Sequence, residues 1–528
     1  MDAGKVIVKY PRNILKFAHL RSFIITELKA GIVYSCAMRK WLPFILFALL
    51  LPLLWLNVKN SHDWGDDFAQ YIIQARNIVE GKAQTNNALI FDEEAGQFAV
   101  TAYPAGFPLL LSPVVAVYGI AIKPLLLLES VFLLILGLLS FHFFRKYFSD
   151  LPAFIFTLFL CYHSLTLELK GQILSEIPFT ALLTAIFLII RSGMFNSKKY
   201  LLIGFMIAFL ASVRIVGLLI IPALAIFLLQ GFLKKDANPL SQNFNRLNFF
   251  IRTTISSSLL FIIFNSLLFD IHLDDFFNFY LNAGQAHETK FIENLFSYYE
   301  QLAYVFKIPF LNHSLVSFLC CGLVLAGMVQ SFRKNAGPEH WFLLLYLLML
   351  GLYPYNSGGF RFLFPIFPPL ILFFFEGIRF FIQKTTPYVQ SSVLIFACLL
   401  LFYSQYYPLK QILKQSSGIT MGPQDKASQE LFSFIRNNTP TDAVVAFPRA
   451  RAMSLYVNRA ATYLIKSNST EENAQLVERL NVSHLIVSKG NETNPLYDDA
   501  LLNYISYDRD KLQPAWENED YIIYRRSD

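Results

Sequence analysis

The chain has 528 residues, of which 55% are hydrophobic, 16% aromatic and only 15% charged, and its mean hydropathy is +0.44. Soluble domains usually carry about 25% charged residues, and 53 phenylalanines are too many for a surface in water. The composition therefore excludes a soluble globular protein and predicts an all-α polytopic membrane protein. The net charge of +7 does not indicate nucleic-acid binding, because the basic residues gather at the ends of apolar segments.

The first forty residues alternate basic and apolar side chains and contain no cleavable signal sequence. They predict a basic amphipathic segment on the cytoplasmic leaflet, over residues 1–40. A first span over residues 41–57 then runs outward, which leaves a long first outer loop, residues 58–123, on the outer side of the membrane.

Residues 41–407 form the predicted transmembrane domain, with about eleven spans, the N-terminus inside and the C-terminus outside. The stretch from Ala105 to Ala121 is short and contains Pro108 and Pro113, and counting it as a span would place every later basic cluster outside. It is therefore expected to lie along the outer membrane face. A second long outer loop covers residues 270–311. The expected spans are residues 41–57, 124–144, 151–167, 176–191, 200–213, 215–232, 249–269, 312–331, 340–355, 362–378 and 389–405.

Residues 408–528 are polar and contain no spanning segment. Short apolar runs at 443–447, 484–487 and 521–524 predict strands, and they alternate with helix-like stretches at 428–437, 471–480 and 498–504. No glycine-rich phosphate loop and no Ser/His/Asp signature is present. We expect a small soluble α/β domain on the extracytoplasmic side.

Several ionisable residues map to the outer boundary in this topology, and none of them maps to the middle of a span. Transporters usually keep such groups near the midplane, so a cluster at one face favours chemistry on a lipid-linked substrate at the membrane surface. Ordinary roles stay open, because Asp and Glu often cap helices and interfacial Arg often contacts headgroups. The residues are Asp66, Asp67, Glu168, Lys170, Glu176, Arg214 and Arg361.

Asp67 and Tyr71 are four residues apart and share a face if the loop is helical. A carboxylate there is able to take a proton from an attacking hydroxyl or amine, and Asp66 is expected to raise its pKa by like-charge repulsion. Arg214 and Arg361 carry guanidinium groups suited to bidentate phosphate binding. The histidines lack metal-binding spacing such as HExxH, so no metal site is expected.

Short motifs recur in a characteristic order along the chain. The first outer loop contains Asp67-x-x-x-Tyr71-x-x-x-Ala75-Arg76-Asn77-x-x-x-Gly81, followed by Tyr103-Pro104-Ala105-Gly106-Phe107-Pro108. Later motifs are Leu174-Ser175-Glu176-Ile177-Pro178-Phe179, Ser212-Val213-Arg214-Ile215-Val216-Gly217-Leu218, Arg361-Phe362-Leu363-Phe364-Pro365-Ile366-Phe367-Pro368, and the run from Phe434 to Arg459. Together they resemble the GT-C-fold glycosyltransferases that use polyprenyl-phosphate sugars, a superfamily that includes protein O-mannosyltransferases and the bacterial lipid A aminoarabinose transferase. The likeness covers most of the chain, and the order of the motifs is more specific than any one of them.

The resemblance implies a GT-C-like fold and an inverting sugar transfer. In that superfamily an acidic residue of the first outer loop acts as base, and outer-face arginines hold the lipid phosphate. Where some members have an Asp-Glu pair, this chain has Asp66-Asp67. Some members use a divalent metal, but nothing in this sequence requires one, and no cofactor is expected. The implied roles are general base for Asp67 with Asp66 as the alternative, phosphate binding for Arg214 and Arg361, and supporting positions for Glu176, Tyr71 and Tyr103.

The expected partners are a polyprenyl-phosphate sugar donor, an acceptor that is a lipid, protein or glycan, and membrane lipids, without nucleic acid. The expected location is the bacterial inner membrane, with the N-terminus cytoplasmic and the C-terminal domain periplasmic. A flippase or transporter of a lipid-linked sugar is one alternative, and it predicts charges inside the bilayer and two similar halves. A non-enzymatic envelope scaffold is the other, and in it the carboxylates and arginines would be replaceable.

Overall fold

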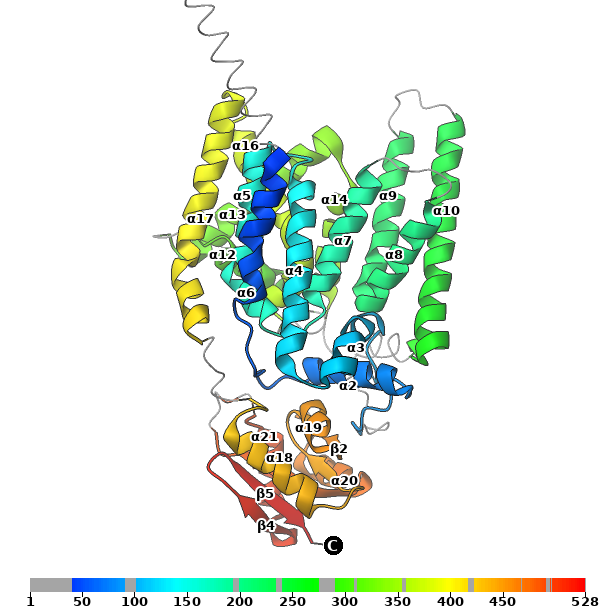
Figure 1. Cartoon of the computed structure of the whole chain (residues 1–528), viewed down its shortest axis with the longest axis vertical. Helices are drawn as coiled ribbons and strands as arrows, with labels where there is room; N and C mark the ends of the chain where they lie inside the picture. The colour runs from blue at the N-terminus through cyan, green and yellow to red at the C-terminus, as the bar shows by residue number, and fades with distance from the viewer. Residues whose placement is uncertain are drawn as a thin grey trace, which may run out of the picture.

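The computed structural model describes residues 40–90, 101–192, 199–233, 240–274, 290–307, 311–353, 358–415, 422–466, 468–490, 494 and 496–527. A helical bundle is joined at one end to a small α/β domain, with the first outer loop between them (Figure 1). We call this end of the bundle the outer end. The amphipathic segment expected over residues 1–40 lies outside the described residues, except for its last residue, as do parts of both outer loops.

The bundle helices follow the predicted apolar segments closely. Among the described residues, five helices are long and apolar enough to cross a membrane, or six if the bent pair α5–α6 counts as one span. The protein is an integral membrane protein, whereas the count of eleven spans stays a prediction. The elements are Lys40–Leu54 with its 3-10 turn η1 (Leu51–Leu54), α4 (Ile122–Phe144), α5 (Asp150–Tyr162), α6 (Ser164–Lys170), α7 (Glu176–Arg191), α8 (Tyr200–Val213), η2 (Ile215–Leu219), α9 (Ile220–Leu233), α10 (Leu240–Ile262), the π-helical η3 (Ile263–Leu268), α12 (Phe291–Val305), α13 (His313–Asn335), α14 (Pro338–Leu352), α15 (Phe360–Leu363), η4 (Phe364–Ile366), α16 (Phe367–Phe381) and α17 (Pro387–Gln415).

The span expected at residues 151–167 is not one straight helix, because the chain bends by 51° between α5 and α6. His163 stands at the bend with extended backbone (φ −62°, ψ 137°). Its Nδ1 accepts a hydrogen bond from the Leu165 backbone N–H at 3.2 Å, and its Nε2 lies 2.9 Å from the carbonyl oxygen of Val305. A buried histidine therefore ends one helix and caps the next.

Two further predicted bounds differ from the structure. The span expected at 362–378 starts irregularly as α15 and η4, since Pro365 lacks the N–H that a continuous helix needs. The helix α17 continues to Gln415, beyond the change of composition at Tyr407.

The first outer loop folds into two helices, α2 (Asp67–Glu80) and α3 (Gly106–Tyr118), which lie next to each other at the outer end (Figure 1). The helix α2 is mostly buried and ends at Gly81, whose φ of +66° favours glycine. At the start of α3, a Cβ on Gly106 would come within 2.5 Å of the Ser212 backbone. Glycine there lets α3 pack directly against the end of α8.

The C-terminal domain is built on a five-stranded sheet with the order β2-β1-β3-β5-β4. The strands β2, β1 and β3 are parallel, whereas β5 and β4 pair antiparallel. The predicted α/β domain is confirmed, although β2, β4 and α19 were not predicted. Its elements are α18 (Lys426–Asn438), β1 (Val444–Ala446), α19 (Ala450–Val457), β2 (Ala460–Thr462), α20 (Thr470–Arg479), β3 (Val482–Ser488), α21 (Asp499–Tyr507), η5 (Arg509–Lys511), β4 (Leu512–Glu517) and β5 (Tyr521–Arg526).

The first outer loop and the α/β domain share one apolar core. Trp64 is buried, and its ring lies edge-on against Phe432 and Phe447, with centroid distances of 6.0 and 5.3 Å. The loop also extends the sheet beside β2, because Ile90 N–H donates to the Ala461 carbonyl and Ala461 N–H donates to the Ala88 carbonyl, each at 2.9 Å. The domain is thereby fixed on the first outer loop.

Candidate functional site

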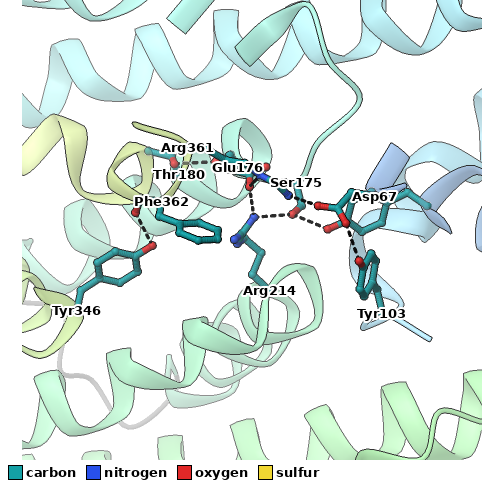
Figure 2. Close-up of polar contacts among 10 residues, drawn as sticks. Asp67, Tyr103, Ser175, Glu176, Thr180, Arg214, Tyr346, Arg361 and Phe362 are labelled. Atoms are coloured by element: carbon teal, nitrogen blue, oxygen red, sulfur yellow. Dashed lines mark hydrogen bonds and ion pairs between the residues drawn. The ribbon is translucent and has the colours of Figure 1, made fainter. Parts of the chain in front are cut away.

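Glu176, the first residue of α7, binds two arginines at the outer end of the bundle (Figure 2). Arg214 Nη1 and Arg361 Nε both donate to its Oε1. The Glu176 side chain is fully buried, whereas Arg214 is 17% and Arg361 28% exposed. Glu176 therefore holds both guanidinium groups at the boundary of the bundle and does more than cap α7.

The local backbone explains why Arg214 projects here. It lies between α8 and η2 in an extended conformation (φ −150°, ψ 128°), so the helix is broken at the arginine. Three residues later, a Cβ on Gly217 would come within 2.9 Å of the Ala211 backbone nitrogen. Glycine at this position allows η2 to turn back closely onto α8.

Asp67 begins α2 and connects the first outer loop to the arginine pair. Its Oδ2 lies 2.6 Å from Arg361 Nη2, and its Oδ1 accepts a hydrogen bond from the Tyr103 hydroxyl at 2.6 Å (Figure 2). The Asp67 side chain is 31% exposed. Both of its oxygens are therefore engaged, while the carboxylate stays within reach of a ligand.

Tyr71 lies in the same site as Asp67, as their four-residue spacing predicted. Its hydroxyl lies 3.0 Å from Ser175 Oγ, which accepts a hydrogen bond from Arg214 Nη1 at 3.1 Å. The rings of Tyr71 and Tyr103 are 5.0 Å apart at their centroids. Burial raises the pKa of both tyrosines, so their hydroxyls stay protonated at neutral pH.

Arg451 of the α/β domain reaches the same site, and sequence reasoning missed it. Its Nη1 donates to the Tyr103 hydroxyl at 2.7 Å, and its guanidinium carbon lies 5.0 Å from the centroid of the Tyr103 ring. Only 4% of Arg451 is exposed. The one available signal was an arginine in the otherwise small and apolar stretch 450–457. Asp66 also contacts this domain, since it accepts a hydrogen bond from the Ala452 N–H at 3.4 Å.

The surroundings shift the pKa values of the two aspartates in opposite directions. Burial opposes ionisation of Asp67, but the charge of Arg361 and the Tyr103 hydrogen bond outweigh it and lower the pKa to about 2. Burial raises the pKa of Asp66 despite the nearby charge of Arg451. The expectation that Asp66 raises the pKa of Asp67 is therefore wrong, because pairing with Arg361 dominates over repulsion.

A largely apolar cavity of about 370 Å³ adjoins the arginine pair. Arg214 is its charged residue, and Tyr346 and Phe362 line it together with aliphatic side chains of η2 and α14. The Tyr346 hydroxyl donates to the Phe362 carbonyl at 2.8 Å (Figure 2). A cavity with apolar walls and one guanidinium suits an amphiphile with an anionic head.

Two residues that were expected in the cluster lie elsewhere. Glu168 lines a separate polar cavity of about 430 Å³, formed by the first outer loop, α6, the end of α12 and α17. Lys170 lies inside the bundle and donates to Ser130 Oγ at 2.8 Å. Within the described residues, Glu168 and Lys170 thus make no hydrogen bond or ion pair with Glu176, Arg214 or Arg361.

Glu129 of α4 is a further buried carboxylate that was not expected in the cluster, and its exposure is 0%. No three His, Cys, Asp or Glu side chains gather as metal ligands in the part of the chain that the structure describes.

Comparison with known proteins identifies the fold. No protein-family model matches the sequence, and no curated protein matches it either. Among solved structures, the chain is similar to ArnT from Cupriavidus metallidurans bound to undecaprenyl phosphate, with 8% identity, a TM-score of 0.59, and coverage of 91% of this chain and 97% of that one. It is also similar to the archaeal oligosaccharyltransferase AglB from Archaeoglobus fulgidus in complex with an inhibitory peptide and a dolichol-phosphate. That match has 11% identity and a TM-score of 0.52, and it covers 85% of this chain and 70% of AglB.

Both solved structures are GT-C-fold glycosyltransferases. The predicted resemblance to this class is therefore confirmed at the level of the fold, for the bundle and the C-terminal domain together.

Proposed function

We propose that the protein is a membrane glycosyltransferase that moves a sugar from a polyprenyl-phosphate-linked donor to an acceptor on the outer face of the bacterial inner membrane. The observation that carries the proposal is the pairing of Arg214, which lines an apolar cavity, with Arg361, which contacts Asp67, through the shared carboxylate of Glu176. The fold supports it, since ArnT was solved with undecaprenyl phosphate and AglB with a dolichol-phosphate.

The donor phosphate is held by the two arginines, with the first part of the polyprenyl chain in the apolar cavity. Both guanidinium groups contact carboxylates in the structure, Glu176 for both and Asp67 for Arg361. In this proposal the phosphate competes with Asp67 for Arg361. Asp67 is the more exposed of the two carboxylates, so it is the one that gives way.

Release of Asp67 prepares the chemical step. A carboxylate with a pKa of about 2 is a weak base, and its low value comes from Arg361. When Arg361 turns to the phosphate, Asp67 regains basicity and takes the proton from an acceptor hydroxyl. That oxygen forms the new bond to the anomeric carbon from the face opposite the phosphate, so the configuration inverts. The bond from the anomeric carbon to the phosphate oxygen breaks, and polyprenyl phosphate leaves with the electron pair.

The acceptor approaches from the other side of the site. The polar cavity is lined by residues of α6, α12 and α17, whereas the apolar cavity is lined by Arg214 and by residues of η2 and α14. The polar cavity carries Lys59, Lys307, Asp63 and Glu168, which suits a hydrated group rather than a lipid tail. An acceptor that is a lipid, a protein or a glycan is consistent with this arrangement.

A transfer assay separates this proposal from transport of a lipid-linked sugar. Proteoliposomes that contain the protein receive polyprenyl phosphates carrying radiolabelled envelope sugars, together with an envelope extract as acceptor. We expect loss of label from the lipid and the appearance of free polyprenyl phosphate, and Asp67→Asn should abolish both. Movement of intact donor between the leaflets, without cleavage, would instead establish a flippase.

A further inference from the structure

The C-terminal domain is connected to the proposed base by two consecutive hydrogen bonds. Arg451 Nη1 donates to the Tyr103 hydroxyl at 2.7 Å, and the same hydroxyl donates to Asp67 Oδ1 at 2.6 Å. A tyrosine hydroxyl has only one hydrogen to donate. Because Arg451 occupies a lone pair of that oxygen as a donor, the hydrogen of Tyr103 is directed to Asp67.

The backbone on both sides of this connection is fixed. Gln74 of α2 accepts from Tyr103 N–H at 2.9 Å and donates to the Tyr103 carbonyl at 2.8 Å, which ties Tyr103 to the helix that carries Asp67. On the domain side, Ser454 Oγ donates to the Asn87 carbonyl at 3.2 Å. Together with the strand-like pairing of residues 88–90 to Ala461, these contacts place α19 against the first outer loop.

We propose that Arg451 is a positioning residue for the base: through Tyr103 it holds Asp67 Oδ1, so that Oδ2 is the oxygen that takes the proton. This rests on the proposed function. In the structure Oδ2 contacts Arg361, and in this proposal it becomes free when Arg361 binds the donor phosphate. The C-terminal domain thus supports the proposed base through Arg451 and Tyr103.

The charged and titratable groups around Asp67 determine how the loss of Arg451 should change the pKa of Asp67. Arg361, Tyr103 and Arg451 each favour the ionised form of Asp67 against its burial. Removal of Arg451 or of the Tyr103 hydroxyl therefore raises the pKa of Asp67. The groups that face the site from the packed elements are Asp66 and Tyr71 of α2, Tyr103 before α3, Glu176 of α7, Arg214 after α8, Arg361 of α15, and Arg449 and Arg451 at α19.

A set of four variants tests the proposal by activity. Arg451→Ala and Tyr103→Phe should each lower kcat about 10-fold or more, the loss expected for a charge-assisted or buried hydrogen bond. The Kd for undecaprenyl phosphate should stay within about twofold of wild type, because Arg214 and Arg361 are unchanged. Arg451→Lys should recover part of kcat, since lysine also donates to the Tyr103 oxygen. The matched control, Arg525→Ala on the exposed part of β5, should behave as wild type.

A double variant shows whether Arg451 and Tyr103 act on Asp67 through the same hydrogen-bonded connection. The double variant of Arg451→Ala with Tyr103→Phe should be no slower than the slower single variant, because both remove the same restraint. Multiplied losses in the double variant, or normal kcat in Arg451→Ala, would overturn the proposal. Tyr103→Phe leaves Arg451 and the domain contact in place, so it keeps the test decisive if Arg451→Ala folds poorly.

A spectroscopic readout is independent of sugar transfer. In protein labelled with ¹³C-aspartate, the infrared band of protonated Asp67 is identified by its absence in Asp67→Asn. Its titration should move to higher pH in Arg451→Ala and Tyr103→Phe, and not in Arg525→Ala. If the wild-type protein transfers no sugar, the proposed function is wrong. The titration of Asp67 still shows whether Arg451 acts on Asp67 through Tyr103. An unchanged titration in both variants would refute it.

Discussion

The two ends of α7 carry two arginine–glutamate networks that differ in one respect. At the inner end, Arg191 Nε donates to Glu339 Oε1 at 2.8 Å, and the Tyr147 hydroxyl donates to the same oxygen. At the outer end, Glu176 receives Arg214 and Arg361. Arg191 and Glu339 are 10% and 0% exposed, whereas Arg361 is 28% exposed and adjoins Asp67, which is 31% exposed.

Packing at the inner end leaves little room for an exchange of partners. A Cβ on Gly337 would come within 2.3 Å of Arg191 Nη2, and the Arg191 guanidinium lies 4.9 Å from the centroid of the Tyr147 ring. At the outer end, Arg214 opens into the apolar cavity and Arg361 is shared between two carboxylates. A buried ion pair is therefore weak support for function by itself, and access to a ligand distinguishes the two networks.

The largest effect is expected for the base. Asp67→Asn keeps the shape and removes the basicity, so kcat should fall roughly 100-fold or more. Asp66→Asn should be milder, because Asp66 contacts the α/β domain and not Arg361. Purified variants are compared in single-turnover transfer assays. If Asp67→Asn had a near-normal kcat and Asp66→Asn were inactive, the base would be Asp66 and not Asp67.

The next effect concerns the donor phosphate. Arg214→Ala and Arg361→Ala should each weaken the use of donor by about 1.5–3 kcal/mol, the cost of a charge-assisted contact. Lysine should recover little, since it lacks the planar fork of guanidinium. Both are measured as kcat/KM for the donor and as Kd for undecaprenyl phosphate. Unchanged constants in both alanine variants would reduce these arginines to membrane anchors.

The dependence on pH should differ between free and donor-bound protein. With Arg361 in place the pKa of Asp67 is about 2, below its ordinary 3.8, so the ionised form is favoured and is lost only as pH falls through the lower value. The donor phosphate draws Arg361 away and raises that pKa. The acid limb of kcat should therefore lie at higher pH than the acid limb of kcat/KM. Coincident limbs would mean that Arg361 does not leave Asp67.

Disruption of the Arg191–Glu339 network at the inner end should leave sugar transfer unchanged. Arg191→Ala removes one partner of a buried pair and should lower the free energy of unfolding by about 3–5 kcal/mol. The Kd for undecaprenyl phosphate, measured below the unfolding temperature, should match wild type. Loss of donor affinity equal to that of Arg361→Ala would erase the distinction between the two ends of α7.

Much of the fold follows from the sequence, because long apolar segments with basic ends leave few arrangements other than a membrane bundle. The association of Asp67, Glu176, Arg214 and Arg361 was also predictable, since their motifs occur in a family-like order. The break at His163 was not, because it depends on a hydrogen bond to Val305, 142 residues away.

Arg451 escaped prediction for a similar reason. Its partner Tyr103 is 348 residues distant, and only the docking of the α/β domain on the first outer loop brings the two together. The pKa of Asp67 was predicted in the wrong direction, because the neighbour in sequence, Asp66, matters less than Arg361, the neighbour in space.

The most direct test measures binding and turnover in the same variant. If Arg361 is shared between Asp67 and the donor phosphate, Asp67→Asn removes a competing anion while it removes the base. We expect Asp67→Asn to bind undecaprenyl phosphate more tightly than wild type, by about tenfold or about 1.4 kcal/mol, and to transfer sugar at a small fraction of the wild-type rate. Weaker or unchanged binding, or turnover that persists, would contradict the exchange of partners at the outer end.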